Sequence, residues 1–112
     1  MEESILISIK KLLGMTKEYT AFDTDVIIHI NTAFLNLTQL GVGPVEGFSI
    51  QDDTAEWVDF IGDNEKINAV QTYIYLKVKQ VFDPPLNSSV LEANKQTIKE
   101  LEWRLNVEAE SK

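Results

Sequence analysis

The segment of residues 67–82 constrains the fold more than any other part of the sequence. Around Tyr73–Leu76 aliphatic residues alternate with other residues as in a half-buried strand, yet the apolar residues of the segment also follow one helical stripe. The stripe consists of Ile67, Val70, Ile74, Val78, Val81 and Phe82. No turn signal interrupts the chain between Glu65 and Asp83, and strands are rarely that long. The pattern therefore predicts a helix of about four turns that begins near Asp63. Asp83-Pro84-Pro85 ends it, because proline disfavours helical geometry in the residue before it.

The apolar face of this helix is wider than a single stripe. Tyr73, Tyr75 and Leu76 extend it over more than half of the circumference. Such a helix is either central in its bundle or shared with a neighbouring molecule. The two tyrosines cannot both face one small core, so we expect at least one of them to be available to a neighbour.

Two helices are predicted before this segment. Residues 2–13 have apolar residues at helical spacing, with Glu2 and Glu3 in the first turn and Gly14 as the residue that ends the helix. A second helix runs from Asp23, its predicted N-cap, to Gly41. Phe22 and Ile27 have the spacing of a hydrophobic staple at its start.

Two further helices are predicted from capping-box spacings. Asp53 and Glu56 begin a short helix that contains Trp57, and Ser89 and Glu92 begin the last helix. The last helix directs Leu91, Ile98, Leu101 and Leu105 inward and places Trp103 on a different face. We expect the tail, residues 107–112, to be frayed.

A long loop separates the second and third predicted helices. Residues 41–53 hold three of the five glycines and one of the three prolines, and they also carry apolar residues. These are Val42, Val45, Phe48 and Ile50. They anchor the loop either to its own core or to a partner. The fold class is therefore all-α: a single domain over residues 1–112, with four to five helices and one long loop at about residues 41–53.

Charge and composition exclude several functions. The net charge is −8, and seven acids without a base fall within residues 46–65, so the surface repels the phosphates that a nucleic-acid-binding protein must neutralise. The chain has no cysteine and one histidine, His29, which rules out disulfides, thiolate metal sites and a cysteine nucleophile. The opening residues lack the basic start of a signal peptide, so we expect a cytosolic product without a membrane segment.

No catalytic, metal-binding or cofactor-binding residue is predicted. Magnesium-dependent nucleotide hydrolases need an acid pair one turn apart on each of two helices, and only Glu56 and Asp59 meet that spacing. We therefore do not expect an enzyme. Trp57 and Trp103 are either core residues or interface anchors, because aromatic anchors dominate interface energies.

Ordered segments over nearly the whole chain resemble a known family. They are SIKKLLGM, EYTAFDTDVIIHINTAFLNLTQLGVGP, GFSI, EWVDFI, TYIYLKVKQVFDPP and ELEWRLNV. In this order they resemble small head-tail connector proteins (head completion or adaptor proteins) of tailed bacteriophages and prophages. The resemblance rests on hydrophobic segments and the FDPP turn, without a catalytic signature.

The resemblance implies a structural virion protein at the head-tail junction, made in the host bacterial cytoplasm. It implies a homo-oligomeric ring, commonly a dodecamer, under the portal protein, joined to another head-tail or tail component. DNA would pass through the channel without specific binding. The loop around Pro44, Phe48 and Ile50 would face another connector component, and Trp103, Arg104 and Leu105 would dock on the portal. Tyr73 and Tyr75 would help to form subunit contacts, and Trp57 is a further candidate interface residue.

An alternative of a different class remains open. A small acidic helical adaptor or regulatory protein would bind a protein partner through the 41–53 loop and would form no ring.

Overall fold

The computed structural model describes residues 4–61, 67–82 and 84–110, and within these residues it contains helices and no strand. The five helices are α1 (Ile5–Leu12), α2 (Asp23–Gln39), α3 (Trp57–Ile61), α4 (Ile67–Phe82) and α5 (Ser88–Glu110). The predicted all-α fold of four to five helices is therefore confirmed. One isolated antiparallel bridge joins Ser4 to Glu56, and the Ile5 N–H donates to the Ala55 carbonyl at 2.9 Å.

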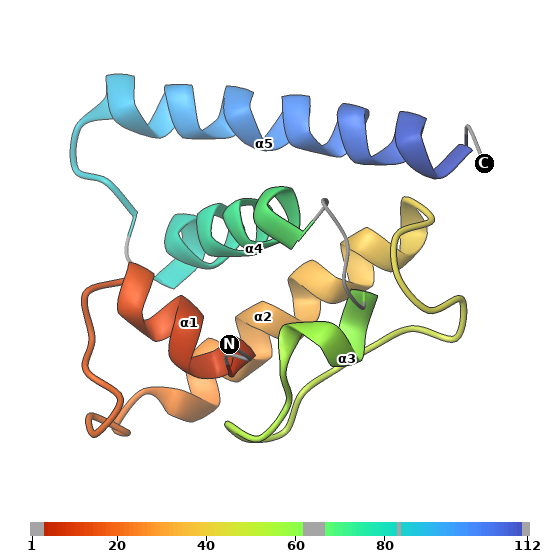
Figure 1. The fold of residues 1–112 in the computed structure, drawn as a ribbon. Helices are drawn as coiled ribbons and strands as arrows, with labels where there is room; N and C mark the ends of the chain where they lie inside the picture. Colours follow the sequence, from red (N-terminus) through yellow and green to blue (C-terminus); the bar gives the residue numbers. More distant parts are fainter. Residues whose placement is uncertain (1–3, 62–66, 83, 111–112) are drawn as a thin grey trace.

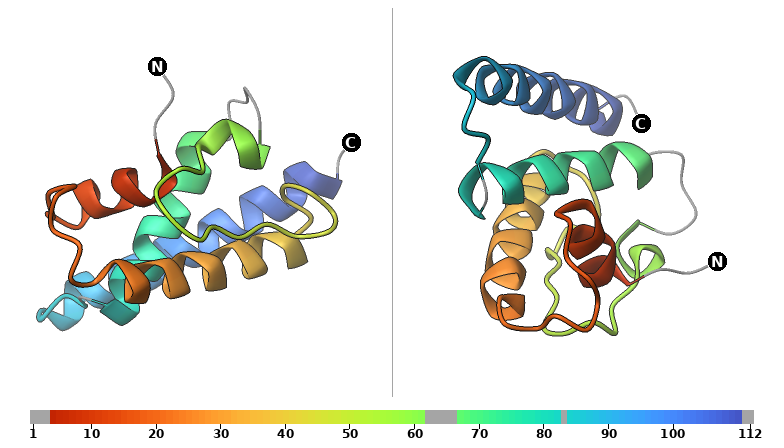
Figure 2. Two further views of the ribbon diagram at one scale, coloured as in Figure 1. Left: turned by 90° about the horizontal axis from the view of Figure 1, so that it is seen from below. Right: turned by 90° about the vertical axis from the view of Figure 1, so that its left-hand side faces the viewer.

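The helices are stacked so that α4 lies in the middle. Figure 1 shows α5 along one side of α4, with α1, α2 and α3 on the other side, and Figure 2 shows the same order from a second direction. The closest packing is between α2 and α4, followed by α4 with α5. This arrangement explains the wide apolar face of residues 67–82, because α4 buries Val70, Tyr73, Ile74, Leu76 and Val78 against neighbours on several sides.

The core is formed mainly by α1, α2 and α4. From α2 it takes residues at the predicted helical spacing: Val26, Ile30, Ala33, Phe34 and Leu37. From α1 it takes Ile5, Leu6 and Ile9. The helix periodicity read from the sequence thus identifies the side chains that are removed from water, which is the largest favourable contribution to folding.

The helix ends differ in detail from the predictions. Ser4 caps α1 by accepting from the Ile7 N–H at 3.3 Å, and Gly14 has the left-handed φ of +88° expected of a residue that ends a helix. The predicted first turn with Glu2 and Glu3 lies outside the described residues, as does a start of α4 near Asp63. The tail beyond residue 107 continues as helix to Glu110, and its fraying stays a prediction.

Three predicted caps are wrong. The N-cap of α2 is Phe22, and Asp23 is the first helical residue, with its carboxylate on Lys10. Asp59, not Asp53, accepts from the Glu56 N–H at the start of α3, at 2.8 Å. At the start of α5 the Asn87 side chain accepts from the Ser89 and Val90 N–H groups, so the cap precedes Ser89 by two residues. In the first case the predicted cap pairs with a distant lysine. In the other two a different nearby side chain accepts the N–H bonds at the start of the helix.

Candidate assembly surface

The 41–53 loop is fastened to the body of its own subunit. The Asn31 side chain on α2 bonds the Ile50 backbone twice, accepting from its N–H at 2.8 Å and donating to its carbonyl at 3.0 Å. The Phe48 ring packs edge-on against Phe34 and Phe60, with centroid distances of 5.0 and 5.3 Å. Of the two outcomes left open by the sequence, anchoring to the core therefore holds for Phe48 and Ile50, and for the buried Val42.

A glycine sets the path of the loop where it leaves α2. Gly43 has a φ of +86°, and a Cβ at this position would lie 2.4 Å from the Phe60 ring. Only glycine fits there without displacing the ring. The chain then turns through Pro44 and Val45 and closes with a bond from the Gly47 N–H to the Pro44 carbonyl at 3.0 Å. Val45 is 96% exposed at this turn, so one apolar side chain projects from an otherwise anchored loop.

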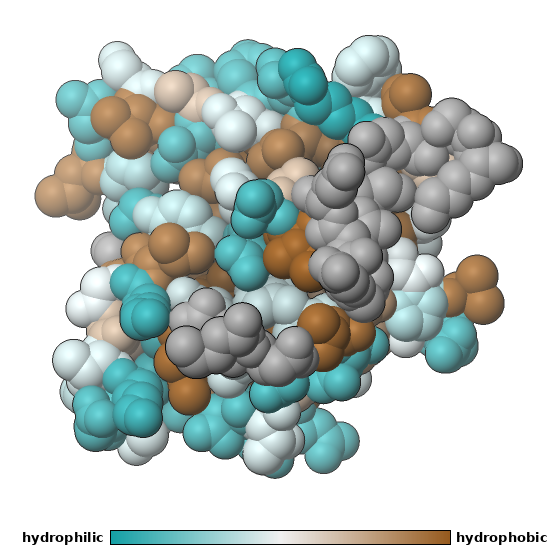
Figure 3. All heavy atoms as spheres, in the orientation of Figure 1, coloured by the Kyte–Doolittle hydropathy of each residue, from teal (hydrophilic) through white to brown (hydrophobic). Residues whose placement is uncertain are grey.

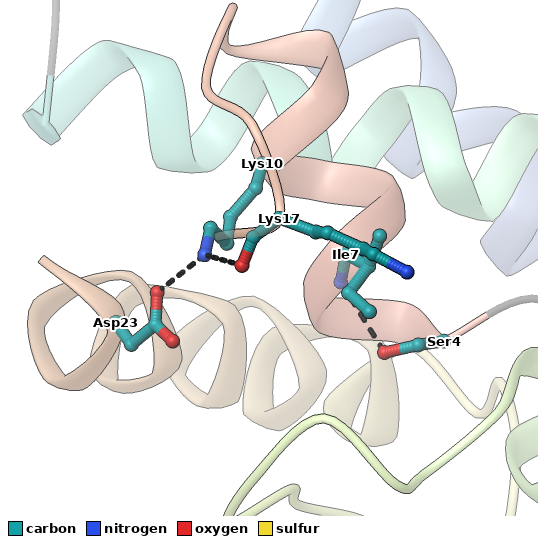
Figure 4. Close-up of polar contacts among 5 residues, drawn as sticks. All are labelled: Ser4, Ile7, Lys10, Lys17 and Asp23. Carbon is teal, nitrogen blue, oxygen red and sulfur yellow. Dashed lines mark hydrogen bonds and ion pairs between the residues drawn. The ribbon is translucent and has the colours of Figure 1, made fainter. Parts of the chain in front are cut away.

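A buried lysine organises the opposite end of α2. Lys10 on α1 has a side chain only 2% exposed, and its Nζ lies 2.8 Å from Asp23 Oδ1. The same Nζ donates to the Lys17 carbonyl at 3.3 Å (Figure 4). Because a buried ammonium group needs a counter-charge and hydrogen-bond acceptors, Lys10 ties the connection between α1 and α2 to the first turn of α2.

Helix α5 is attached by few side chains. Ile98 and Leu105 are its buried apolar residues among those described. The Tyr73 hydroxyl on α4 donates to Glu102 Oε2 at 2.7 Å, and Asn106 Nδ2 donates to the Leu40 carbonyl at 3.1 Å. Burial and the neighbouring Glu102 carboxylate raise the pKa of the Tyr73 hydroxyl well above its ordinary value.

The nine predicted interface residues fall into three groups. Four are buried within the subunit: Ile50, Trp57, Tyr73 and Leu105. Three are partly buried: Pro44, Phe48 and Tyr75. Two are exposed on α5: Trp103 and Arg104, the latter paired with Glu100 at 3.3 Å. Of the two tryptophans, Trp57 is a core residue whose Nε1 donates to Ser8 Oγ at 3.1 Å, and Trp103 is 67% exposed.

An aromatic cluster that sequence reasoning missed lies at the start of α2. Phe22 packs edge-on against Tyr19 at 5.9 Å and against Phe82 at 5.5 Å between ring centroids. We call Tyr19, Phe22 and Phe82 the aromatic cluster. Tyr19 is 47% exposed and Phe22 is 42% exposed, and Leu86 in the next connection is fully exposed. In Figure 3 apolar residues, drawn brown, lie among the hydrophilic ones in the middle of the face shown as well as toward its two sides.

Charge is distributed unevenly along the chain. Residues 18–65 contain ten acidic side chains and no lysine or arginine. Within the acidic loop, the Asp52 carboxylate accepts from the Thr54 hydroxyl and N–H, which lowers the pKa of Asp52. In the described part of the chain no three His, Cys, Asp or Glu residues are grouped to hold a metal ion. None of the described helices is long and apolar enough to cross a membrane.

The fold and surface define the class as a small all-α bundle with several exposed apolar side chains. The family comparison identifies it further, because the model of the family described as phage connector protein matches residues 5–112. The chain belongs to this family, in agreement with the resemblance seen in its sequence. No curated protein matches it, and no solved structure matches it.

Of the two features that sequence reasoning missed, only the buried lysine could have been found from the sequence. Lys10 follows Leu6 by four positions and so lies on the apolar face of its helix, which indicates a lysine that needs a partner. The aromatic cluster gives no comparable signal, because Tyr19 lies in a connection, and Phe82 is sixty residues away from Phe22 in the sequence.

Proposed function

We propose that this phage connector protein assembles into a ring beneath the portal and joins the DNA-filled head to the tail. Its role is structural and not catalytic. Copies associate through one repeated head-to-tail contact that closes into a circle, and the ring then binds its neighbours above and below with the summed strength of many weak contacts. The protein acts at the head-tail junction of the virion and is made in the cytoplasm of the host.

The single observation that carries this proposal is the family match over residues 5–112. The surface supports it in a second way. Val45, Trp103 and Leu86 are large apolar side chains that the subunit leaves in water. A single exposed apolar side chain is ordinary in a globular protein. Val45, however, lies on an anchored turn and Trp103 on a regular helix, so little conformational entropy would be lost when either binds a partner.

We infer roles in the ring for these side chains from where they lie on the subunit. Trp103 and Arg104 on α5 are the proposed contacts with the portal, because they are exposed on a helix that lies along the outer side of α4. Leu105 supports them from below by holding α5 on the body. Pro44, Phe48 and Tyr75 are proposed to lie at or beside subunit contacts. Ile50, Trp57 and Tyr73 are proposed to act indirectly, by fixing the shape of these surfaces.

The channel of the ring is proposed to pass DNA without binding it. The acidic range of residues 18–65 carries no base that would neutralise a phosphate. A wall built from such a surface repels the duplex and lets it slide.

Electron microscopy of the protein mixed with purified portal rings from the same phage tests the proposal. We expect a second ring of density at one end of the portal, at fixed stoichiometry. Portal particles that bind scattered single copies, or none, would contradict it. Single copies bound through the 41–53 loop would instead support a small acidic adaptor, which the exposed Val45 also suits.

A further inference from the structure

We propose that α5 is exchanged between copies in the ring, so that the α5 of one copy leaves its own body and packs on α4 of the next copy. The occupant of the α4 surface is therefore a second copy of this chain. This inference rests on the proposed ring and names the contact that builds it. Each body receives α5 from one neighbour and gives its own α5 to the other, which is a head-to-tail contact that can close into a circle.

The surfaces that meet in the exchange already fit one another within the subunit. Ile98 and Leu105 of α5 are buried, and the Tyr73 hydroxyl on α4 donates to Glu102 Oε2 at 2.7 Å. Farther along α5, Asn106 Nδ2 donates to the Leu40 carbonyl at 3.1 Å. Every copy has the same body, so a second copy offers α5 the same partners in the same places. The exchanged contact thus needs no surface beyond those that the structure shows in contact.

The release of α5 breaks few contacts of the body. The helix begins at Ser88, and its first buried side chain among those described is Ile98, ten residues later. Residues 88–90, in the first turn, are exposed. Because a segment with few buried apolar contacts opens at a lower free energy than the core, α5 can leave while α1, α2 and α4 stay folded.

The connection between α4 and α5 favours an extended path. Pro84 and Pro85 fix their φ angles near about −65° and lack the N–H that a helix would need, so the chain resists folding into a helical turn here. The Asn87 side chain bonds forward, to the Ser89 and Val90 N–H groups of α5. Figures 1 and 2 show this connection at an edge of the subunit.

The dimensions allow α5 to reach a neighbour. The chain from Phe82 to Ser88 spans up to about 20 Å when it is extended. With 23 residues, α5 itself is about 35 Å long. The shortest dimension of the subunit is 23 Å. An extended connection therefore carries the buried half of α5 to the α4 of an adjacent body.

Exposed apolar side chains lie on both sides of the connection. Val81 in the last turn of α4 is 60% exposed, Leu86 in the connection is fully exposed, and Val90 in the first turn of α5 is 47% exposed. In the exchanged ring the connection crosses from one body to the next, so these side chains lie between two bodies. The exchange replaces the other contacts of α5 by identical ones. Burial of these three side chains is therefore the gain that favours the ring over separate subunits.

A disulfide that locks α5 on its own body tests the exchange, because the natural chain has no cysteine. A Cβ built on Gly41 lies 3.3 Å from the Ala109 Cβ, close to the spacing that a disulfide needs. The variant G41C/A109C, oxidised as a dilute monomer, closes this bond within one chain. We expect the oxidised variant to add no ring to purified portal rings in electron microscopy, and we expect reduction to restore the ring.

The reduced variant controls for strain at Gly41, whose φ is +85°, because it carries the same cysteine. The matched control for a disulfide is S4C/E56C, which closes the antiparallel bridge within the body. It should assemble equally well when oxidised and when reduced.

Oxidation after assembly gives the opposite readout. The reduced G41C/A109C variant, assembled on portal rings and then oxidised, should give a ladder of dimers, trimers and longer species on denaturing gels, because each disulfide then joins two chains. Monomers alone would overturn the exchange and leave the proposed ring standing. A ring formed equally well by the variant locked before assembly would do the same. Absence of a ring with the natural protein would overturn the ring itself.

A second variant tests the exchange without a change at Gly41. Because Leu86 is fully exposed in the subunit, Leu86→Asp should leave the unfolding midpoint unchanged and weaken assembly by about tenfold or more. Leu35→Asp, at a 58% exposed position on α2 away from the connection, should leave assembly unchanged. Equal assembly of Leu86→Asp and the natural protein would contradict the proposal.

Discussion

Helices α2 and α5 differ in how many of their side chains they bury. In its 17 residues α2 buries five side chains completely, whereas α5 has 23 residues and buries only Ile98 and Leu105 among its described side chains. Polar bonds from Tyr73 to Glu102 and from Asn106 to Leu40 add to these contacts. The difference teaches that the body of α1, α2 and α4 supplies stability, and that α5 is an attached helix whose outer surface remains exposed.

The largest expected difference is between the two tryptophans. Trp57→Ala should lower the free energy of unfolding by about 3–5 kcal/mol, because it empties a buried site and leaves Ser8 without its indole partner. Trp103→Ala should change it by less than about 0.5 kcal/mol, since that ring is exposed on α5. Urea unfolding followed by far-ultraviolet circular dichroism measures both. Similar losses in the two variants would break the distinction between body and α5.

The two ion pairs give the next contrast. Asp23→Ala should cost about 2–3 kcal/mol, because it leaves the Lys10 ammonium buried without a counter-charge, although water reaches the Asp23 side of the pair. Glu100→Ala removes an exposed pair with Arg104 on α5 and should cost less than about 0.5 kcal/mol. The same unfolding measurement compares them. A small effect of Asp23→Ala would show that Lys10 finds water or another acceptor.

The hydroxyl of Tyr73 tests the attachment of α5 itself. Tyr73→Phe keeps the ring and removes the bond to Glu102, so the expected loss is about 1–2 kcal/mol. Hydrogen exchange should show faster exchange along α5 and little change in α2, because the lost bond joins α5 to the body. Thr97→Val, which removes a hydroxyl bonded only within α5 to the Ala93 carbonyl, is the control. Uniform acceleration in all helices would contradict a separate attachment.

The raised pKa of the Tyr73 hydroxyl predicts that the stability of the folded protein falls at high pH. The pKa of Tyr73 is raised in the folded protein, so the unfolded chain releases this proton first as the pH rises. Stability from this group is therefore fully present below about pH 10 and falls above it, by up to about 1.4 kcal/mol for each further pH unit. Unfolding of the natural protein and of Tyr73→Phe from pH 8 to 11 measures the effect. Parallel pH curves for the two proteins would exclude Tyr73 as its source.

The body could be predicted from the sequence far better than the surface. Apolar spacing identified α2 and α4 because burial selects side chains on one face, and that selection is visible in a single chain. Caps were predicted less well. Asp23 has the right residue type for an N-cap, but a lysine thirteen residues earlier competes for its carboxylate. Local spacing contains no information about such a partner.

The interface residues show the same limit. Tyr73 and Trp57 resemble interface anchors in the sequence, yet α4 is covered on several sides and Trp57 has a partner in Ser8 on α1. Only the packing of distant segments decides this. The exposure of Val45 also depends on packing: no sequence pattern distinguishes it from Val42 and Ile50, yet it is the most exposed of the loop's apolar residues.

Native mass spectrometry of purified portal rings mixed with this protein tests the central claim most directly. If the stable body exists to present assembly surfaces, the mass should increase in one step by a fixed whole number of copies, with no partly filled rings at limiting protein. A broad distribution of independently bound copies, or no increase in mass, would contradict the account.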